Sequence, residues 1–411
     1  MLNKIYLLLL ILNIHHKVFA QLFSISGKIT DAETGNVIGN ASVFLSNTSY
    51  GTVTNSKGEF VLNNIRQGKY DLIVSYVGYE TFAKTISNES VTAQLNIQLK
   101  QKARELKNVT VKTYDKNGWQ NWGQFFTDNF IGASLYSKSC TIKNTDVIRF
   151  SFSKKKNELT AFATEPLIIE NKALGYIIRY QLEDFTYQFT GHYLFYAGYP
   201  LFEDMKGGKG KIKRWAKARA DVYDVSMMHF MRSLYRNKLK QDGYQMYHLK
   251  RTPNVEKQRW MAKEKNYFDT VSHKVTIMSY ASTLPADSFA LYDKYIHQKD
   301  PIEIIEPVEI TGDSIAYAED SVTAAIDFKD FLIVRYLKRV MPDEYFATTK
   351  SGGKNQPVSS TLNLLNNKPV YITSNGYYYN VEDLLSEGFW GWWEKMGNTL
   401  PYDYVPPATA K

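Results

Sequence analysis

The sequence predicts a mainly β protein: a seven-stranded antiparallel sandwich followed by a larger, β-dominated α+β domain with one amphipathic helix. Apolar and polar residues alternate with period two through the first hundred residues and again after Ser134, which is typical of strands with one buried face. The chain also holds 30 Tyr and 22 Phe among 411 residues, and aromatic side chains favour strands. A chain of this length exceeds one ordinary core, so we expect more than one domain.

Residues 1–20 are predicted to be a secretory signal peptide that is cleaved after Ala20. Lys4 precedes the apolar run of residues 5–12, and the segment ends in a small residue. We therefore expect export to the periplasm or the outer-membrane surface of a gram-negative cell, where nucleic acid is a poor partner. The apolar run is too short to cross a bilayer and no later stretch approaches about 20 apolar residues, so we expect no transmembrane span.

Residues 22–100 are predicted to form the sandwich. The alternation is clearest in FSISGKIT, NASVFLSN, KYDLIVSYVGY and TAQLNIQLK, and turn-forming clusters separate these stretches in DAETGN, NSKG, RQGK and VGYE. Gly58 is expected to adopt a positive φ at a hairpin tip, after which Phe60 and Leu62 point inward. About seven short strands in so few residues is typical of a two-layer sandwich.

Several spaced motifs in this region occur in the order found in a known family. They are Gly27 in the first strand, Thr34-Gly35, the GT of residues 51–52 leading into TNSKGEF, the NI of residues 64–65, and YVGYE. This order resembles the carboxypeptidase regulatory-like domain, a transthyretin-like sandwich. The resemblance implies a module that does no chemistry and that stands at the N-termini of outer-membrane receptors and other exported gram-negative proteins. No catalytic residue is carried over from it.

The rest of the chain is divided into a connector, residues 101–122, with one strand at 109–111, and a β-rich domain, residues 123–407. We expect a hairpin with a KKKN tip near residues 146–163 and three strands between residues 167 and 198. An amphipathic helix is predicted at about 225–241, with Ser226 as its N-cap and Gly243 after its end. Strands are expected at KVTIMSYAS, EIIEPVEI, SVTAAIDFKDFLIVRYLKR and PVYITSNGYYYN, and a loop at 350–360.

The sequence predicts no catalytic, cofactor-binding or metal-ligating residue. No His has a Glu at ligand spacing, which argues against a metallocarboxypeptidase, and neither a G-x-S-x-G elbow nor a complete phosphate loop occurs. The only cysteine, Cys140, excludes an intrachain disulfide and is expected to be a buried, inert thiol. A glycosidase needs only two carboxylates and leaves no sequence spacing, so a pair among Glu165, Glu170, Glu183 and Asp184 stays open.

Two clusters each allow two interpretations. Trp390, Trp392 and Trp393 could stack on sugar rings if they are exposed, or close the domain as a plug if they are buried. The stretch from Lys206 to Arg219 holds seven basic residues and no acid. It is either a solvated loop leading into a helix or a contact for an anionic surface. The seven residues are Lys206, Lys209, Lys211, Lys213, Arg214, Lys217 and Arg219.

These observations favour an exported, non-enzymatic envelope protein without a cofactor. The sandwich would serve as a docking or spacer unit, and the larger domain would bind an outer-membrane protein or an envelope polymer, with peripheral membrane contact possible. The alternative is a protein that binds or processes carbohydrate through exposed aromatic side chains.

Overall fold

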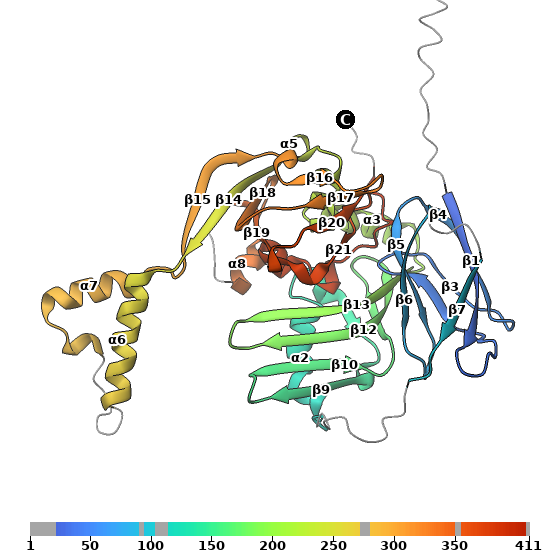
Figure 1. Cartoon of the computed structure of the whole chain (residues 1–411), viewed down its shortest axis with the longest axis horizontal. Coiled ribbons are helices and arrows are strands. Elements are labelled where there is room, and N and C mark those ends of the chain that lie inside the picture. Colours follow the sequence, from blue (N-terminus) through green and yellow to red (C-terminus); the bar gives the residue numbers. More distant parts are fainter. Residues whose placement is uncertain (1–21, 90–93, 103–113, 272–279, 350–354, 408–411) are drawn as a thin grey trace, which may run out of the picture. The chain divides into compact units, whose positions relative to one another are not determined.

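The computed structural model describes residues 22–89, 94–102, 114–271, 280–349 and 355–407. The chain is 41% strand and 28% helix, which confirms the mainly β class (Figure 1). Its internal contacts form two units, Met1–Val222 with Met396–Lys411, and Tyr223–Lys395. This grouping divides residues 123–407 between the units. The predicted signal peptide and the strand at 109–111 lie outside the described residues.

Seven strands form the predicted sandwich at the start of the first unit. One sheet has the order β4-β1-β7 and the other β3-β2-β5-β6. The strands are β1 (Leu22–Asp31), β2 (Ser42–Leu45), β3 (Gly51–Val53), β4 (Glu59–Arg66), β5 (Lys69–Ser75), β6 (Phe82–Ser87) and β7 (Leu95–Leu99). One pair departs from the predicted antiparallel pattern, because β1 and β7 run parallel, from Gly27 beside Leu95 to Asp31 beside Leu99.

The alternation of the sequence places the sandwich core as predicted. Ile25 and Ile29 of β1 and Leu72 of β5 are fully buried between the two sheets. Gly27 allows β1 to lie close to its neighbours, since a Cβ there would stand 2.5 Å from the carbonyl oxygen of Leu95. Gly58 has φ of +74°, as the hairpin tip requires.

A six-stranded antiparallel sheet completes the first unit. Its order is β8-β11-β12-β10-β9, and β13 pairs with β12. The strands are β8 (Cys140–Ile142), β9 (Ile148–Ser153), β10 (Glu158–Ala163), β11 (Leu167–Asn171), β12 (Tyr176–Gln188) and β13 (Tyr193–Asp204). Helix α2 (Gly118–Phe130), which was not predicted and begins within the predicted connector, covers one face of this sheet through Phe126 and Phe130.

Two further segments belong to the first unit. Helix α3 (Lys209–Asp224), which lies in this unit as far as Val222, contains most of the basic stretch. The C-terminal segment returns to the unit, where the Asn398 side chain accepts a hydrogen bond from Ser134 (2.7 Å) and the Asn171 side chain donates to the Gly397 carbonyl (2.9 Å).

The second unit is built on two antiparallel sheets. Their orders are β15-β14-β18-β19-β22 and β16-β17-β20-β21. The strands are β14 (Tyr244–Thr252), β15 (Ile302–Ile310), β16 (Ala316–Ala318), β17 (Thr323–Ile326), β18 (Phe331–Val340), β19 (Pro357–Leu364), β20 (Val370–Thr373), β21 (Tyr378–Tyr379) and β22 (Leu384–Gly388). Residues 357–360 of the predicted loop at 350–360 belong to β19 instead, and residues 350–354 are not described.

The predicted amphipathic helix is present but interrupted. It forms α4 (Met227–Tyr235) and α5 (Leu239–Asp242), and Asn237 between them has φ of +50°. Ser226 caps α4 by accepting a hydrogen bond from the backbone N–H of His229 (3.2 Å). Gly243, with φ of +97°, ends α5 as predicted.

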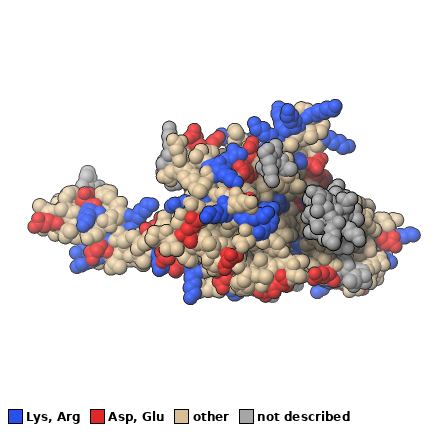
Figure 2. Space-filling view, turned by 90° about the horizontal axis from the view of Figure 1, so that it is seen from above, with Lys and Arg blue, Asp and Glu red and all other residues tan. Residues whose placement is uncertain are grey.

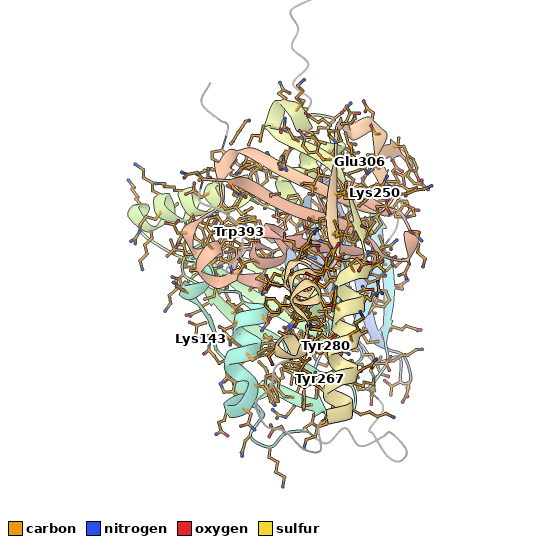
Figure 3. All side chains as sticks on the ribbon, turned by 90° about the vertical axis from the view of Figure 1, so that its left-hand side faces the viewer. Lys143, Lys250, Tyr267, Tyr280, Glu306 and Trp393 are labelled. Carbon is orange, nitrogen blue, oxygen red and sulfur yellow. The ribbon has the colours of Figure 1, made fainter. Side chains whose placement is uncertain are left out.

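Four other helices of the second unit were not predicted. They are α6 (Val255–Val271), α7 (Ala286–Ile296), α8 (Asp343–Thr349) and α9 (Phe389–Trp393). Strands β14 and β15 continue as a two-stranded ribbon to α6 and α7 (Figure 1). Lys250 and Glu306 form an ion pair across this ribbon (2.6 Å) (Figure 3). Beyond the ribbon, the ring of Tyr267 in α6 packs on the ring of Tyr280, with 5.5 Å between the two centroids. The first six residues of the predicted strand KVTIMSYAS lie in the undescribed residues 272–279, and its last three belong to a short 3-10 helix at Tyr280–Thr283 instead of a strand.

Candidate functional site: a cavity between the sandwich and the second sheet

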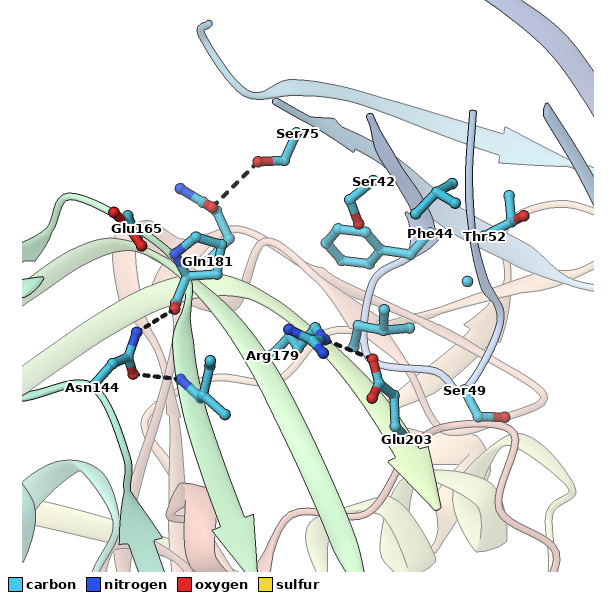
Figure 4. Close-up of a pocket in the computed structure, with 15 residues that line it drawn as sticks. Ser42, Phe44, Ser49, Thr52, Ser75, Asn144, Glu165, Arg179, Gln181 and Glu203 are labelled. Atoms are coloured by element: carbon cyan, nitrogen blue, oxygen red, sulfur yellow. Dashed lines mark hydrogen bonds and ion pairs between the residues drawn. The ribbon is translucent and has the colours of Figure 1, made fainter. Parts of the chain in front are cut away.

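A cavity of about 720 Å³ opens in the first unit between the sandwich and the six-stranded sheet (Figure 4). The sandwich contributes residues of β2, β3 and the end of β5, and the second sheet contributes residues of β11, β12 and β13. Residues that are far apart in the sequence therefore form opposite walls of one site.

Strand alternation explains why these side chains point into the cavity. On β12, Tyr180 and Leu182 are buried on the face that α2 covers, so the neighbouring residues Arg179 and Gln181 point to the other side. On β2, Val43 lies in the sandwich core, so Ser42 and Phe44 point outward, toward the cavity. The outer face of the sandwich is thus a wall of the site.

Two apolar residues of the lining, Phe44 and Leu201, also hold the two walls together. With Ile73 they form a buried cluster, against which Tyr199 packs. Backbone hydrogen bonds reinforce the contact, because Asn47 N–H donates to the carbonyl of Pro200 (2.8 Å) and Phe202 N–H donates to that of Thr48 (3.0 Å). The sandwich is therefore packed against the second sheet of its own chain.

Some polar groups of the cavity already have partners. Arg179 donates through Nε to Glu203 (2.7 Å), and the Asn144 side chain both donates to the Pro166 carbonyl (2.9 Å) and accepts from the Ile168 N–H (2.8 Å). The hydroxyl of Ser49 donates to Asp403, which lies near the C-terminus.

Other polar groups of the lining remain available to a ligand. Within the described ranges, the side chains of Ser42, Thr52 and Glu165 make no hydrogen bond. Gln181 accepts one long hydrogen bond from Ser75 (3.5 Å) through Oε1, which leaves its amide N–H groups available. The Nη groups of Arg179 likewise have no further partner in the described part of the chain.

The carboxylates proposed for glycosidase chemistry are not brought together. Glu165 lines the cavity, whereas Glu170 forms ion pairs with Lys143 and Lys172, both at 3.7 Å. Glu183 and Asp184 are exposed on β12. The second carboxylate of the cavity is Glu203, which the sequence analysis missed. Alternation along β13 could have identified it as a residue on the same face as Leu201.

The tryptophan cluster is mostly buried. The exposed fractions of Trp390 and Trp393 are 2% and 6%, and Trp392 is half-buried. The indole N–H of Trp390 donates to the Val225 carbonyl (3.0 Å), and its ring lies 5.2 Å from that of Phe230. Trp393 stacks on Phe389, with 5.1 Å between the ring centroids. Trp390 and Trp393 therefore have no free face for a sugar.

The basic stretch is helical over most of its length. Six of its seven cations are exposed, and Arg219 is the exception. Arg219 donates to the Leu174 carbonyl (2.7 Å) and to Asp204 (2.7 Å), and it lies over the ring of Tyr176 (3.7 Å). The predicted contact for an anionic surface thus rests on the remaining six residues.

Two side chains of types that often take part in catalysis, a cysteine and a histidine, lie outside the cavity. Burial raises the pKa of the Cys140 thiol to about 12, consistent with an inert thiol. Burial also lowers the pKa of His229, whose Nδ1 lies 2.9 Å from the Asp224 carbonyl and 3.1 Å from the Tyr244 hydroxyl.

Among the residues described, no group of three or more His, Cys, Asp or Glu side chains could hold a metal ion. No helix in that part of the chain is long and apolar enough to span a membrane.

The described residues up to 102 thus form a two-layer β-sandwich of the kind that serves as an accessory module. Residues 25–111 match the sequence model of the CarboxypepD_reg-like domain family, which confirms the predicted resemblance. This domain is a regulatory, immunoglobulin-like module and not a catalytic one.

Other comparisons add little. No curated protein matches the chain. Two type II cohesin–X-dockerin complexes from Acetivibrio cellulolyticus, one with a C-terminal and one with an N-terminal interface mutation, are similar over 18% of this chain and 51% of theirs. The identities are 26% and 27%, and both TM-scores are 0.15. The match thus spans about half of those chains, and so small a structural overlap carries no argument here.

Proposed function

We propose that this protein is exported to the envelope of a gram-negative cell and acts there by binding, without catalysis. Its ligand is a short, uncharged saccharide segment of an envelope polymer, held in the cavity between the sandwich and the second sheet. The supporting observation is the lining of that cavity, in which planar polar groups with available hydrogen-bonding capacity lie beside the apolar residues Phe44 and Leu201.

This lining suits the surface of a sugar ring. A pyranose carries hydroxyl groups around its rim and apolar C–H groups on its faces. The Gln181 amide, the Nη groups of Arg179 and the Glu165 carboxylate can each bond to neighbouring hydroxyls, while Phe44 and Leu201 can contact the C–H faces. The cavity of about 720 Å³ is within the usual size of small-ligand sites.

The charges of the cavity favour a neutral ligand. Arg179 is paired with Glu203, and Glu165 adds a negative charge without a cation among the described residues. A polyanion would therefore be repelled. The same pairing argues for binding over hydrolysis, because a glycosidase needs two carboxylates free to act at the scissile bond, and Glu203 is held by a guanidinium.

A glycan array probed with the full mature chain tests this proposal. We expect binding to uncharged glycans, and affinity that falls about tenfold in Gln181→Leu, because a sugar hydroxyl left without its partner costs roughly 1–3 kcal/mol. The matched control is Gln98→Leu, an exposed glutamine on β7 outside the cavity, which should bind as the wild type does.

Three results with glycans would contradict the proposal. They are an array without any bound neutral glycan, equal affinity in the wild type and Gln181→Leu, and release of shortened glycan products. Binding of extended peptides in place of glycans would also count against it, since the edge strand β3 borders the same cavity.

A further inference from the structure

Helix α3 carries a second surface, independent of the cavity and of the proposed function. The cavity lining contains no residue of α3. Lys209, Lys213 and Lys217 follow one another at intervals of four residues, so they lie on one face of the helix, and Arg214 lies beside them. All four are exposed. We call these four residues the basic face.

The opposite side of α3 attaches the helix to the unit. Trp215 is buried, its indole N–H donates to the Lys172 carbonyl (3.0 Å), and its ring packs against Gly175 so closely that a Cβ there would stand 2.2 Å away. Arg219, one turn later, is tied down by the contacts already described. These anchors hold α3 with its basic face turned to solvent. Figure 3 shows α3 as the pale yellow-green helix with nitrogen-tipped side chains extending outward, and Figure 2 shows Lys and Arg side chains projecting along the upper edge of the view.

The basic face opposes the stability of its own helix. Lysines four residues apart repel one another, and cations near the N-terminus of a helix are disfavoured by the helix dipole. The first turn of α3 holds no acid. In the described ranges no carboxylate forms an ion pair with any of the four cations, whereas Arg219 has Asp204. Repelling charges that no nearby opposite charge offsets are expected at functional surfaces, where binding to another molecule can offset them.

We propose that the basic face of α3 binds the anionic headgroup surface of a membrane. Three lysines in a row extend over about 12 Å of a straight helix, which gives a convex line of charge suited to a flat surface, whereas a single acidic polysaccharide chain would be held better by a groove. Ile212, which is 54% exposed at the edge of this face, supplies an apolar side chain at headgroup depth. The charges of the cavity and of the basic face thus select ligands of different chemistry.

Flotation of the full mature chain with lipid vesicles tests this proposal. The chain should float with vesicles of equal parts phosphatidylglycerol and phosphatidylcholine and stay behind with phosphatidylcholine alone, and salt should weaken the binding. Combining Lys209→Gln, Lys213→Gln and Lys217→Gln should lower the partition coefficient roughly a hundredfold, since each cation near an anionic surface strengthens binding about fivefold.

The matched control removes the same charge elsewhere. Lys154→Gln, Lys155→Gln and Lys156→Gln alter three exposed lysines at the tip between β9 and β10, and this variant should bind nearly as the wild type does. Equal loss in both triple variants, equal binding to neutral vesicles, or binding of a soluble acidic polysaccharide without binding of vesicles would overturn the proposal. Gln181→Leu should leave vesicle binding unchanged, which separates a failure here from a failure of the saccharide proposal.

Discussion

Asp31 is the residue that ties the end of the first strand to two distant parts of the sandwich. Its carboxylate accepts hydrogen bonds from the Tyr79 hydroxyl (2.6 Å), the Gln101 amide (2.9 Å) and the backbone N–H of Thr34 (2.7 Å). The Tyr79 hydrogen bond is the largest of the causes that hold the pKa of this carboxyl well below its ordinary range. The hydrogen bonds of the folded chain therefore favour the ionised form of the Asp31 carboxyl.

The lowered pKa of Asp31 predicts a pH dependence of stability. A carboxyl whose pKa is lower in the folded than in the unfolded chain stabilises the fold fully above the unfolded pKa of about 3.9, and this contribution is lost as the pH falls toward the folded pKa. Asn at this position carries no charge. The difference in thermal midpoint between the wild type and Asp31→Asn, followed by circular dichroism, should therefore shrink as the pH is lowered below about 4. A difference that is constant with pH would contradict this assignment.

At the scale of single elements, α4 shows how local signals specify a helix. Ser226 lies just before it and is buried. Its hydroxyl accepts from the His229 N–H and donates to the Tyr223 carbonyl (2.8 Å), and the Met227 N–H donates to Glu394 (2.8 Å). Two of the N–H groups left unpaired at the start of the helix thus find acceptors.

Removal of this cap should measurably weaken the second unit. We expect Ser226→Ala to lower the free energy of unfolding by about 1 kcal/mol, measured by urea denaturation at constant m-value. The control is Ser374→Ala, at an exposed serine of the same unit, for which a change within about 0.5 kcal/mol is expected. An equal effect of both substitutions would remove the capping role from the account.

Helices and strands could be predicted where the residues that specify them are close together in the sequence. The cap at Ser226, the glycine at 243 and the alternating strands all follow from neighbours in the sequence. Helix α2 was missed because its two glycines resemble a connector, although Trp119, Trp122, Phe126 and Phe130 recur at helical spacing. Helix α6 was missed because its charged residues surround few apolar ones, and its apolar side chains Val255, Met261 and Phe268 remain exposed.

At the scale of the whole molecule, the cavity could not be predicted from any one strand. It arises because the sandwich packs against a sheet far along the chain, and alternation says which residues share a face but not which faces meet. One signal was present. Phe44 and Ile73 are apolar at positions that the alternation assigns to the outer face of the sandwich, and both are buried in the contact with Leu201. An apolar residue on the outer face of a strand thus marked the packing surface.

Only some of the cavity residues could be predicted, for the same reason. Glu165 lies in the cavity, but Arg179, Gln181 and Glu203 were not singled out, because ordinary polar residues acquire a shared role only when two sheets meet. Trp390 and Trp393 attract attention as a sequence cluster, yet they fill the core of the second unit. Clusters of large aromatic residues are more often packing than recognition.

The central claim is that the sandwich and the second sheet bind one saccharide together. Hydrogen–deuterium exchange of the full mature chain, with and without the neutral glycan that the array identifies, tests it most directly. The account predicts slower exchange on binding in both walls, at residues 42–53 and at residues 179–203, and unchanged exchange at residues 389–393. Slowing confined to one wall, or to the tryptophan segment, would contradict it.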